Sequence, residues 1–353
     1  MKKKSFSQIK EILQDAKKGK MFILVDDDDR ENEGDLVIPG SKCDSKKINF
    51  MAKHGRGLIC LALTATKVKK LNLPLMSSIN KSRTQTAFTV SIESKKGIST
   101  GISAYDRAKT IKVAIKPSSN KNSIVSPGHV FPLVARDGGV LERAGHTEAS
   151  VDISKLAKLN PSAVICEVMN ENGTMARYKD LIPFAKKHKL KIAKIEDLIS
   201  YRLKNEKLIK YISNKKVKIK KFGYFDLETF KNKLDGSEHY TISKGKFTSN
   251  KASRVRVIST NVLNNFYNLN NDNFINSLKY LNKFNSFALI LIKGKNLNPA
   301  SSENGKILRY YGIGAQIIKE LKLRKMILVS RSIKRVIALD GYGIKITKQE
   351  IMK

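Results

Sequence analysis

A run of acidic residues directly follows an apolar segment near the start of the chain, and this arrangement constrains the fold more than any other part of the sequence. Residues 21–25 read Met-Phe-Ile-Leu-Val, which is typical of a buried strand, and residues 26–35 read Asp-Asp-Asp-Asp-Arg-Glu-Asn-Glu-Gly-Asp. Carboxylates this close repel one another, so a folded chain keeps them together only where water, cations or bases neutralise their charge. Because α/β folds place ligands at strand ends, the run is either a solvated acidic turn or part of a divalent-metal site.

Three further segments carry polar groups that suit acid–base chemistry. His129 follows the Pro-Gly pair at 127–128, and Arg143 to Thr147 combines a cation, a glycine, an imidazole and a hydroxyl. Glu167 interrupts the apolar residues 163–168. A charge inside a buried strand is costly unless it is paired or ligated. A lone histidine is more often structural, but together these groups favour a metal-assisted acid–base site.

The chain resembles the 3,4-dihydroxy-2-butanone 4-phosphate synthase family, which makes the four-carbon precursor of riboflavin. The resemblance covers residues 5–203, and the family's motifs occur in order at 26–35, 87–91, 99–107, 127–133 and 143–149. The chain has Ser126 where the family often has arginine before the Pro-Gly-His motif. This departure concerns a contact near the rim of the active site.

The resemblance implies a carbon–carbon lyase that converts D-ribulose 5-phosphate into L-3,4-dihydroxy-2-butanone 4-phosphate and formate. It implies Mg²⁺ or Mn²⁺ held by Glu31 and His146, with no organic cofactor and no zinc. His129 and Glu167 would be the catalytic acid–base groups, and the division of work between them stays open. The implied substrate-binding residues are Arg30, Glu31, Asp35, Arg143, Ala144, Gly145, His146, Thr147 and Glu167.

Hydrophobic periodicity predicts a mixed α/β (α+β) layered fold for a first domain at residues 1–204. Residues 142–150 should run from a loop into a helix, whose first N–H groups could hold phosphate. The predicted helices are 6–16, 154–158, 178–189 and 194–204, and the predicted strands are 21–25, 57–63, 86–92, 111–115 and 163–168.

A second α/β domain is predicted at residues 207–353, with strands at 217–224, 288–293 and 326–330 and a helix at 314–321. Its fragments 235–243, 253–259, 311–316 and 339–344 resemble GTP cyclohydrolase II. The resemblance implies a zinc ion held by three cysteine thiolates, yet the last cysteine is Cys166, His239 alone cannot build such a site, and residues 292–299 do not match the family's Glu-Gly-Arg segment. We therefore expect no cyclohydrolase activity. A structural, partner-binding or nucleic-acid-binding role stays open.

The formal net charge is +37, and the excess of basic residues is larger after residue 200. Such a surface attracts nucleic acid, but the sequence has no zinc knuckle or helix-turn-helix pattern, and the asparagine-rich segment 261–273 resembles the drift of an AT-rich genome. We expect no specific nucleic-acid partner. Three unevenly spaced cysteines predict no disulfide framework, and no apolar run reaches the ~18 residues of a membrane span. We expect a cytoplasmic homodimer.

Overall fold

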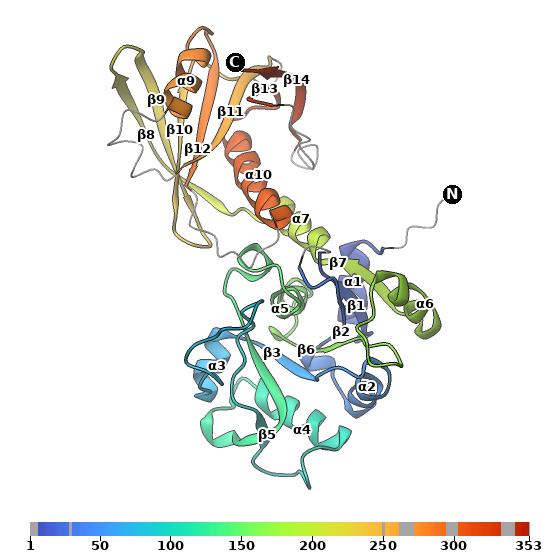
Figure 1. The fold of residues 1–353 in the computed structure, drawn as a ribbon. Coiled ribbons are helices and arrows are strands. Elements are labelled where there is room, and N and C mark those ends of the chain that lie inside the picture. The colour runs from blue at the N-terminus through green and yellow to red at the C-terminus, as the bar shows by residue number, and fades with distance from the viewer. Residues whose placement is uncertain are drawn as a thin grey trace. The chain divides into compact units, whose positions relative to one another are not determined.

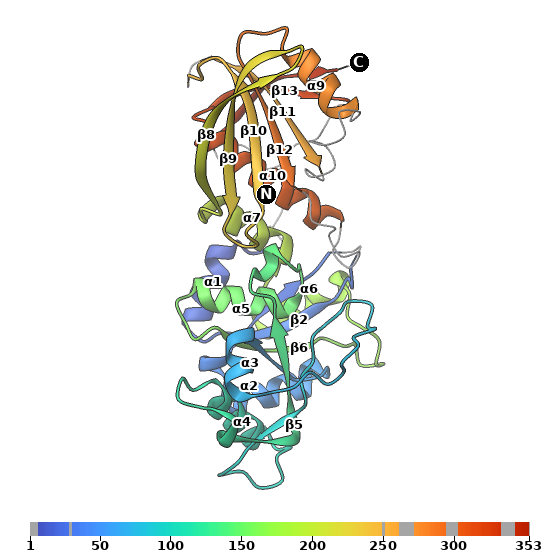
Figure 2. The ribbon, with the colours of Figure 1, turned by 90° about the vertical axis from the view of Figure 1, so that its left-hand side faces the viewer.

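The computed structural model describes residues 6–27, 30–248, 251–260, 272–293, 303–332 and 343–352. Within these ranges the chain forms two compact units, and the division falls between Ile199 and Ser200, inside helix α7 (Ile195–Asn205). Each unit contains a seven-stranded mixed sheet (Figures 1 and 2). The mixed α/β class is therefore confirmed. The domain limits 1–204 and 207–353 stay a prediction.

The sheet of the first unit has the strand order β4-β5-β3-β6-β2-β1-β7. Its pairs are antiparallel except β3 with β5 and β1 with β7, which are parallel. Strand β1 is apolar and buried along its whole length, and β2 and β6 are apolar except for Asp35 in β2 and the end residues Ser162 and Glu167 of β6, because helices cover both faces of the sheet. The strands are β1 (Phe22–Val25), β2 (Gly34–Pro39), β3 (Cys60–Thr64), β4 (Ile92–Ser94), β5 (Ile124–Ala135), β6 (Ser162–Glu167) and β7 (Lys191–Lys194).

Helices α2, α3, α4 and α6 contribute to the main hydrophobic core of the first unit, and α5 packs on the other face of the sheet, where Val151 contacts Ala62 and Ala135. Helix α1 lies against α5, β1 and β7. The helices are α1 (Ile9–Lys17), α2 (Ser45–Phe50), α3 (Ala65–Leu71), α4 (Ala104–Ile115), α5 (His146–Leu156) and α6 (Tyr178–His188), and a π-helical turn, Met51–Gly55, follows α2.

Several predicted elements of the first unit are confirmed: the strands at 21–25 and 163–168, the helices at 6–16, 178–189 and 194–204, and the loop that enters a helix within 142–150. The predicted strand at 57–63 is β3, which begins at Cys60, and the predicted helix at 154–158 overlaps the end of α5.

Two predicted strands are wrong. Residues 111–115 form the last part of α4, because Ser103 caps that helix by accepting the N–H of Asp106 (3.0 Å), and the buried Ala108, Ile111 and Ile115 recur at helical spacing. Residues 86–91 make only isolated bridges, such as Phe88 with Leu133, before β4 starts at Ile92.

The second unit is a sheet in the order β14-β13-β11-β12-β10-β9-β8 with its own apolar core, which includes Phe225, Phe287 and Leu289. Its helices are α9 (Asp272–Leu281) and α10 (Glu303–Glu320). Its strands are β8 (Ile209–Ile219), β9 (Gly223–Asn232), β10 (Glu238–Lys244), β11 (Ser253–Thr260), β12 (Phe287–Lys293), β13 (Lys325–Ser330) and β14 (Lys345–Ile351).

The strands predicted at 288–293 and 326–330 are confirmed, and the predicted helix at 314–321 is the C-terminal half of α10. The strand predicted at 217–224 is wrong, because the chain reverses direction there between β8 and β9, with Lys221 at φ +72°. Parts of three segments discussed above, namely 261–271, 294–299 and 339–342, lie outside the described residues.

All three cysteines, Cys43, Cys60 and Cys166, have free thiols. In the part of the chain that the structure describes, no helix combines the length and the apolar character needed to cross a membrane.

Candidate active site

The acidic run folds into the loop that joins the antiparallel strands β1 and β2. Val25 pairs with Gly34, and the Asp26 N–H donates to the Glu33 carbonyl at 3.3 Å, which closes the loop. Asn32 has φ +54°, a left-handed conformation that asparagine adopts more readily than most residues. Asp28 and Asp29 lie outside the described residues. The loop therefore holds its described carboxylates at the ends of two neighbouring strands.

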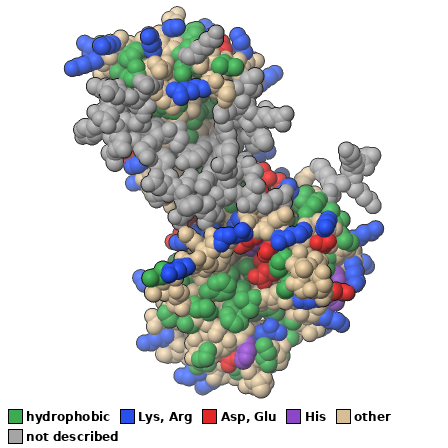
Figure 3. Space-filling model, viewed as in Figure 1, with side chains coloured by type: hydrophobic (Ala, Val, Ile, Leu, Met, Phe, Trp, Pro, Cys, Tyr) green, Lys and Arg blue, Asp and Glu red, His purple; other side chains and the backbone are tan. Residues whose placement is uncertain are grey.

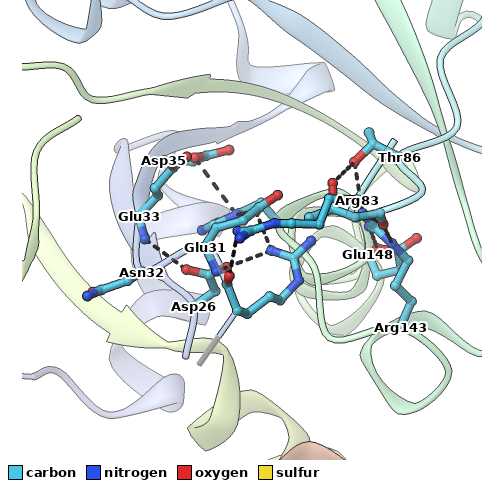
Figure 4. A network of polar contacts seen from close by, with 12 residues as sticks. Asp26, Glu31, Asn32, Glu33, Asp35, Arg83, Thr86, Arg143 and Glu148 are labelled. Atoms are coloured by element: carbon cyan, nitrogen blue, oxygen red, sulfur yellow. Dashed lines mark hydrogen bonds and ion pairs between the residues drawn. The ribbon is translucent and has the colours of Figure 1, made fainter. Parts of the chain in front are cut away.

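Asp26 organises this loop from inside. Its buried carboxylate accepts the backbone N–H groups of Glu31 (3.3 Å) and Glu33 (2.9 Å) and the Arg30 guanidinium (2.6 Å). Arg30 also donates to the Glu31 carboxylate (Figure 4). Burial alone would lower the pKa of Arg30, but the charges of Glu31 and Asp26 raise this pKa above its ordinary value, so the guanidinium stays charged. The sequence alone assigned no role to Asp26; its position directly after β1 was the available signal.

A possible metal-binding group lies beside this loop. Asp26, Glu31 and His146 each offer a ligand atom, and these atoms lie within 4.8 Å of one another. His146 is the first residue of α5; its Nδ1 is 3.8 Å from Glu31 Oε2 and 3.9 Å from Asp35 Oδ1, and its buried Nε2 has no hydrogen-bond partner among the described residues. Burial lowers the pKa of His146, which favours the neutral imidazole that metals require.

Carboxylates with one imidazole form a donor set that suits Mg²⁺ or Mn²⁺. The carboxylate of Asp26 is already used by two backbone N–H groups and Arg30, whereas Glu31 keeps one oxygen outside its bond to Arg30. Within the described residues, the atoms best placed to bind a metal ion are therefore a carboxylate oxygen of Glu31 and a ring nitrogen of His146.

Asp35 and Glu167 form a pair of neighbouring carboxyl groups on adjacent strands. They are direct partners in the β2–β6 ladder, so both side chains project from the same face of the sheet. Burial, and next the charge of Glu167, raise the pKa of Asp35 well above its ordinary value. Burial also raises the pKa of Glu167. Neighbouring carboxyls with raised pKa values hold protons to a higher pH than isolated ones, so the pair suits both donation and acceptance of a proton.

Glu167 is held in place by the segment before β3. Its Oε2 accepts the Leu58 N–H at 2.8 Å. A Cβ at Gly57 would lie 2.6 Å from both the Glu167 carbonyl oxygen and Oε2, so this close approach requires glycine. The π-helical turn at residues 51–55 ends directly before this contact.

His129 pairs with a different carboxylate, that of Glu93. It projects from β5, its side chain is 43% exposed, and its Nδ1 contacts the carboxylate of Glu93 on β4. Among the described residues it makes no hydrogen bond with Asp35 or Glu167. Ser126, which replaces the family's arginine, donates to the Ser91 carbonyl at 2.7 Å. No local sequence pattern points to Glu93, because it pairs with His129 across 36 residues.

The predicted phosphate-binding residues surround the start of α5. Arg143 donates from Nη1 to Glu148 (2.6 Å), from Nε and Nη2 to the Thr84 carbonyl (3.2 and 3.0 Å), and from Nη2 to the Thr86 hydroxyl (2.9 Å). A Cβ at Gly145 would lie 2.3 Å from Arg143 Nη1, so Gly145 makes room for the guanidinium.

Gly145 is also the N-cap of α5 and supplies no side-chain cap, which leaves the first N–H groups of the helix available to an anion. Thr147 is buried in that first turn, and Ala144 is buried before it. On the face seen in Figure 3, acidic side chains of the first unit gather with basic side chains close by. The structure thus brings Arg30, Glu31, Asp35, His146 and Glu167 into one connected group beside the start of α5.

Comparisons with known proteins match both parts of the chain. The family model for 3,4-dihydroxy-2-butanone 4-phosphate synthase matches residues 10–201, and the model for GTP cyclohydrolase II matches residues 276–350. Riboflavin biosynthesis protein RibBA of Aquifex aeolicus is 42% identical over 99% of this chain and 93% of its own length. A 3,4-dihydroxy-2-butanone 4-phosphate synthase of Photobacterium phosphoreum is 42% identical over 98% of this chain and 99% of its own.

Solved structures agree with these matches. RibBX, a two-domain 3,4-dihydroxy-2-butanone 4-phosphate synthase from A. baumannii, superimposes with a TM-score of 0.83 at 39% identity, covering 98% of this chain and 99% of its own. A 3,4-dihydroxy-2-butanone 4-phosphate synthase in complex with two magnesium ions has a TM-score of 0.54 at 37% identity and covers 57% of this chain and 98% of its own.

Replacing Asp35 by Asn should raise the thermal stability of the full-length protein at neutral pH. The folded state holds the Asp35 proton to a higher pH than the unfolded chain, whose pKa is near 3.8, so the stability from this proton is present below that pKa and is lost as the pH rises through the folded pKa. Asparagine carries no charge and avoids that loss. Thermal unfolding followed by circular dichroism in EDTA should give Asp35→Asn the higher Tm at pH 7.5, and the difference should disappear toward pH 4.

Asp15→Asn is the matched control, because Asp15 forms an ion pair with Lys191 at 3.1 Å and its loss should not stabilise the fold. A Tm of Asp35→Asn at or below that of the unchanged protein at pH 7.5 would show that the Asp35 carboxyl is not destabilised by its surroundings.

Proposed function

The chain belongs to the 3,4-dihydroxy-2-butanone 4-phosphate synthase family and carries a GTP cyclohydrolase II-like domain, and on this premise we propose that it converts D-ribulose 5-phosphate into L-3,4-dihydroxy-2-butanone 4-phosphate and formate. The main support for this proposal is one observation: the neutral imidazole of His146, the Glu31 carboxylate and the Asp35–Glu167 pair lie close together. A sugar phosphate that must be enolised, dehydrated and rearranged needs charge stabilisation and repeated proton transfer at one place.

We propose that Glu31 and His146 hold Mg²⁺ or Mn²⁺. A divalent ion bound there supplies Lewis-acid polarisation of the sugar's carbonyl and hydroxyl oxygens. The group of Asp26, Glu31 and His146 contains no cysteine, and burial raises the pKa of the Cys60 and Cys166 thiols, which disfavours their thiolate forms, so we propose no zinc. The chemistry of the reaction requires no organic cofactor. One related synthase structure is a complex with two magnesium ions, which supports the choice of metal class.

Protons are moved in this proposal by Asp35, Glu167 and His129. Both Asp35 and Glu167 have raised pKa values, and we propose that one of them, in its protonated form, donates to a leaving hydroxyl while the other accepts a proton from the sugar. Glu93 fixes the His129 ring through Nδ1, which leaves Nε2 to accept or donate a proton. We assign no order to these transfers.

We propose that the phosphate group binds at the start of α5. The N–H groups of His146 and Thr147 and the Thr147 hydroxyl are the donors, and the small Ala144 and Gly145 allow the group to approach the backbone. Arg30 and Arg143 add positive charge, although each is also bound to a carboxylate of the protein.

For the second part of the chain we propose a structural or partner-binding role without cyclohydrolase chemistry, because no cysteine follows Cys166. We also propose that the protein is a homodimer in the cytoplasm, where free thiols persist, and that it has no specific nucleic-acid partner.

Replacing Glu31 by Gln should abolish formate release and weaken Mn²⁺ binding at least ~10-fold, because it removes a charged metal ligand. Formate release from D-ribulose 5-phosphate and electron paramagnetic resonance of free Mn²⁺ measure the two effects separately. Glu171→Gln, at a side chain that is 90% exposed, is the control and should change neither. Unaltered Mn²⁺ affinity in Glu31→Gln would remove Glu31 from the metal site.

Glu167→Gln and His129→Asn should each lower kcat by ~100-fold or more with a smaller effect on KM, which is the scale of general acid–base catalysis. Initial rates over a range of D-ribulose 5-phosphate concentrations separate the two constants. A variant with normal kcat and a raised KM would make that residue a binding group instead.

A protein comprising residues 1–206 should still release formate from D-ribulose 5-phosphate, since every synthase motif precedes residue 204. The full-length protein should not consume GTP with or without added Zn²⁺, because it lacks the thiolates for a catalytic zinc. Light scattering on both proteins tests the homodimer and shows whether the second part is needed for it. Formation of formate from GTP would instead require a bifunctional enzyme with a different metal site.

A further inference from the structure

The family motifs place two arginines near the substrate, and both already bind carboxylates of the protein. Arg30 lies between Asp26 and Glu31 and is bound to both. Arg143 is bound to Glu148 and uses its Nε and Nη2 on Thr84 and Thr86. A guanidinium has five N–H donors, so Arg143 keeps little capacity for a ligand. A phosphate dianion entering this acidic region needs a cation that no carboxylate already neutralises.

Among the described residues, Arg83 is such a cation. Its exposed side chain donates from Nη2 to the backbone carbonyl of Arg30 at 2.9 Å. This is its one side-chain hydrogen bond within the described residues, and none of their carboxylates forms an ion pair with it. Figure 4 shows Arg83 between the acidic loop around Glu31 and the contact of Thr86 with Arg143. This bond uses one of the two N–H groups of Nη2, so the second can pair with the neighbouring N–H of Nε or Nη1 in the two-pronged geometry that matches phosphate oxygens.

The segment that carries Arg83 is fixed on both sides. Asn80 Nδ2 donates to the Thr86 carbonyl at 2.9 Å, and the Ser82 hydroxyl donates to Asn80 Oδ1 at 2.7 Å. Thr84 and Thr86 bind Arg143, which precedes α5. The segment thus joins the acidic loop to the start of the helix where the phosphate group is proposed to bind, and it holds Arg83 next to both.

We propose that Arg83 binds the phosphate group of the substrate and makes the site select phosphorylated over unphosphorylated sugars. The inference rests on the proposed function for the identity of the substrate. Its physical basis is a difference among three arginines within the described ranges: Arg30 and Arg143 form ion pairs with neighbouring carboxylates, whereas Arg83 contacts the same loop through a neutral carbonyl.

The test compares Arg83→Gln, Arg83→Lys and the control Lys81→Gln, which removes a positive charge from an exposed position in the same segment. In Arg83→Gln, KM for D-ribulose 5-phosphate should rise about 10-fold and kcat should stay within about 3-fold, because a charge-assisted contact to a non-reacting group is lost. The KM of Arg83→Lys should lie between those of Arg83→Gln and the unchanged protein, and the KM of Lys81→Gln should equal that of the unchanged protein. Two inhibitors add a second readout: Ki for inorganic phosphate should rise by the same factor as KM, and Ki for D-ribulose should not change.

Two results would overturn the inference. The first is an unchanged KM and phosphate Ki in Arg83→Gln. The second is an equal loss of affinity for phosphate and for D-ribulose, which would mean that Arg83 only supports the acidic loop.

Calorimetric titration of D-ribulose 5-phosphate separates this inference from the proposed function. If the unchanged protein released no formate but bound the sugar phosphate about 10-fold more tightly than Arg83→Gln, the proposed reaction would fail while the role of Arg83 would stand. If it released formate and Arg83→Gln bound the sugar phosphate equally well, the reaction would stand and the inference about Arg83 would fail.

Discussion

Repulsion among carboxylates at the ends of β1, β2 and β6 is the constraint on which the rest of the site depends. The protein relieves it in two physically different ways. Arg30 donates to the carboxylates of Asp26 and Glu31, and backbone N–H groups also donate to Asp26. Asp35 and Glu167 lie side by side on adjacent strands, and burial raises the pKa values of both, so they release their protons at a higher pH than exposed carboxyls do. The carboxylates beside Arg30 can hold a metal, whereas the pair of Asp35 and Glu167 can exchange protons. Acid–base and metal-binding roles are therefore separated by the surroundings of chemically similar side chains.

The strand register is what brings these groups together. Asp35 and Glu167 face each other because β2 and β6 pair in one specific register, in which Leu36 and Cys166 project into the core on the opposite face. A slip of one residue would turn these apolar side chains toward the site and the carboxyls into the core, which the burial free energy forbids. The same apolar pattern that stabilises the sheet thus aligns the proton-exchanging pair. Helix α5 then adds His146 at its first position, where burial keeps the imidazole neutral.

Local sequence patterns predicted those parts of the structure that local chemistry determines. The apolar run at 21–25, the loop after it and the glycine before His146 were recognisable because strand ends and helix starts have short signals. Residues 111–115 were mistaken for a strand, because a short apolar run does not distinguish a buried strand from the apolar face of α4. The pairs Glu93–His129 and Arg83–Arg30 could not be predicted, since each joins segments that only tertiary packing brings into contact. Motif resemblance identified the chemistry of the site, but it gave no information about which charges are already neutralised.

The role of an arginine in an acidic site depends on whether protein carboxylates already neutralise its charge. An arginine whose N–H groups are bound by protein carboxylates stabilises the arrangement of those carboxylates, and moving it to a ligand would leave them unpaired at a free-energy cost of a few kcal/mol. Arg30 and Arg143 are of this kind, so their substitution should disturb the acidic loop and the start of α5 as well as the ligand. An arginine whose side chain is hydrogen-bonded to a neutral carbonyl, which is the one such bond of Arg83 in the described part of the chain, can bind an anion without breaking an ion pair there. The number of N–H donors already committed to the protein is therefore a better guide to ligand binding than the presence of arginine in a motif. It explains how one site can position several arginines for structure and still retain one for recognition.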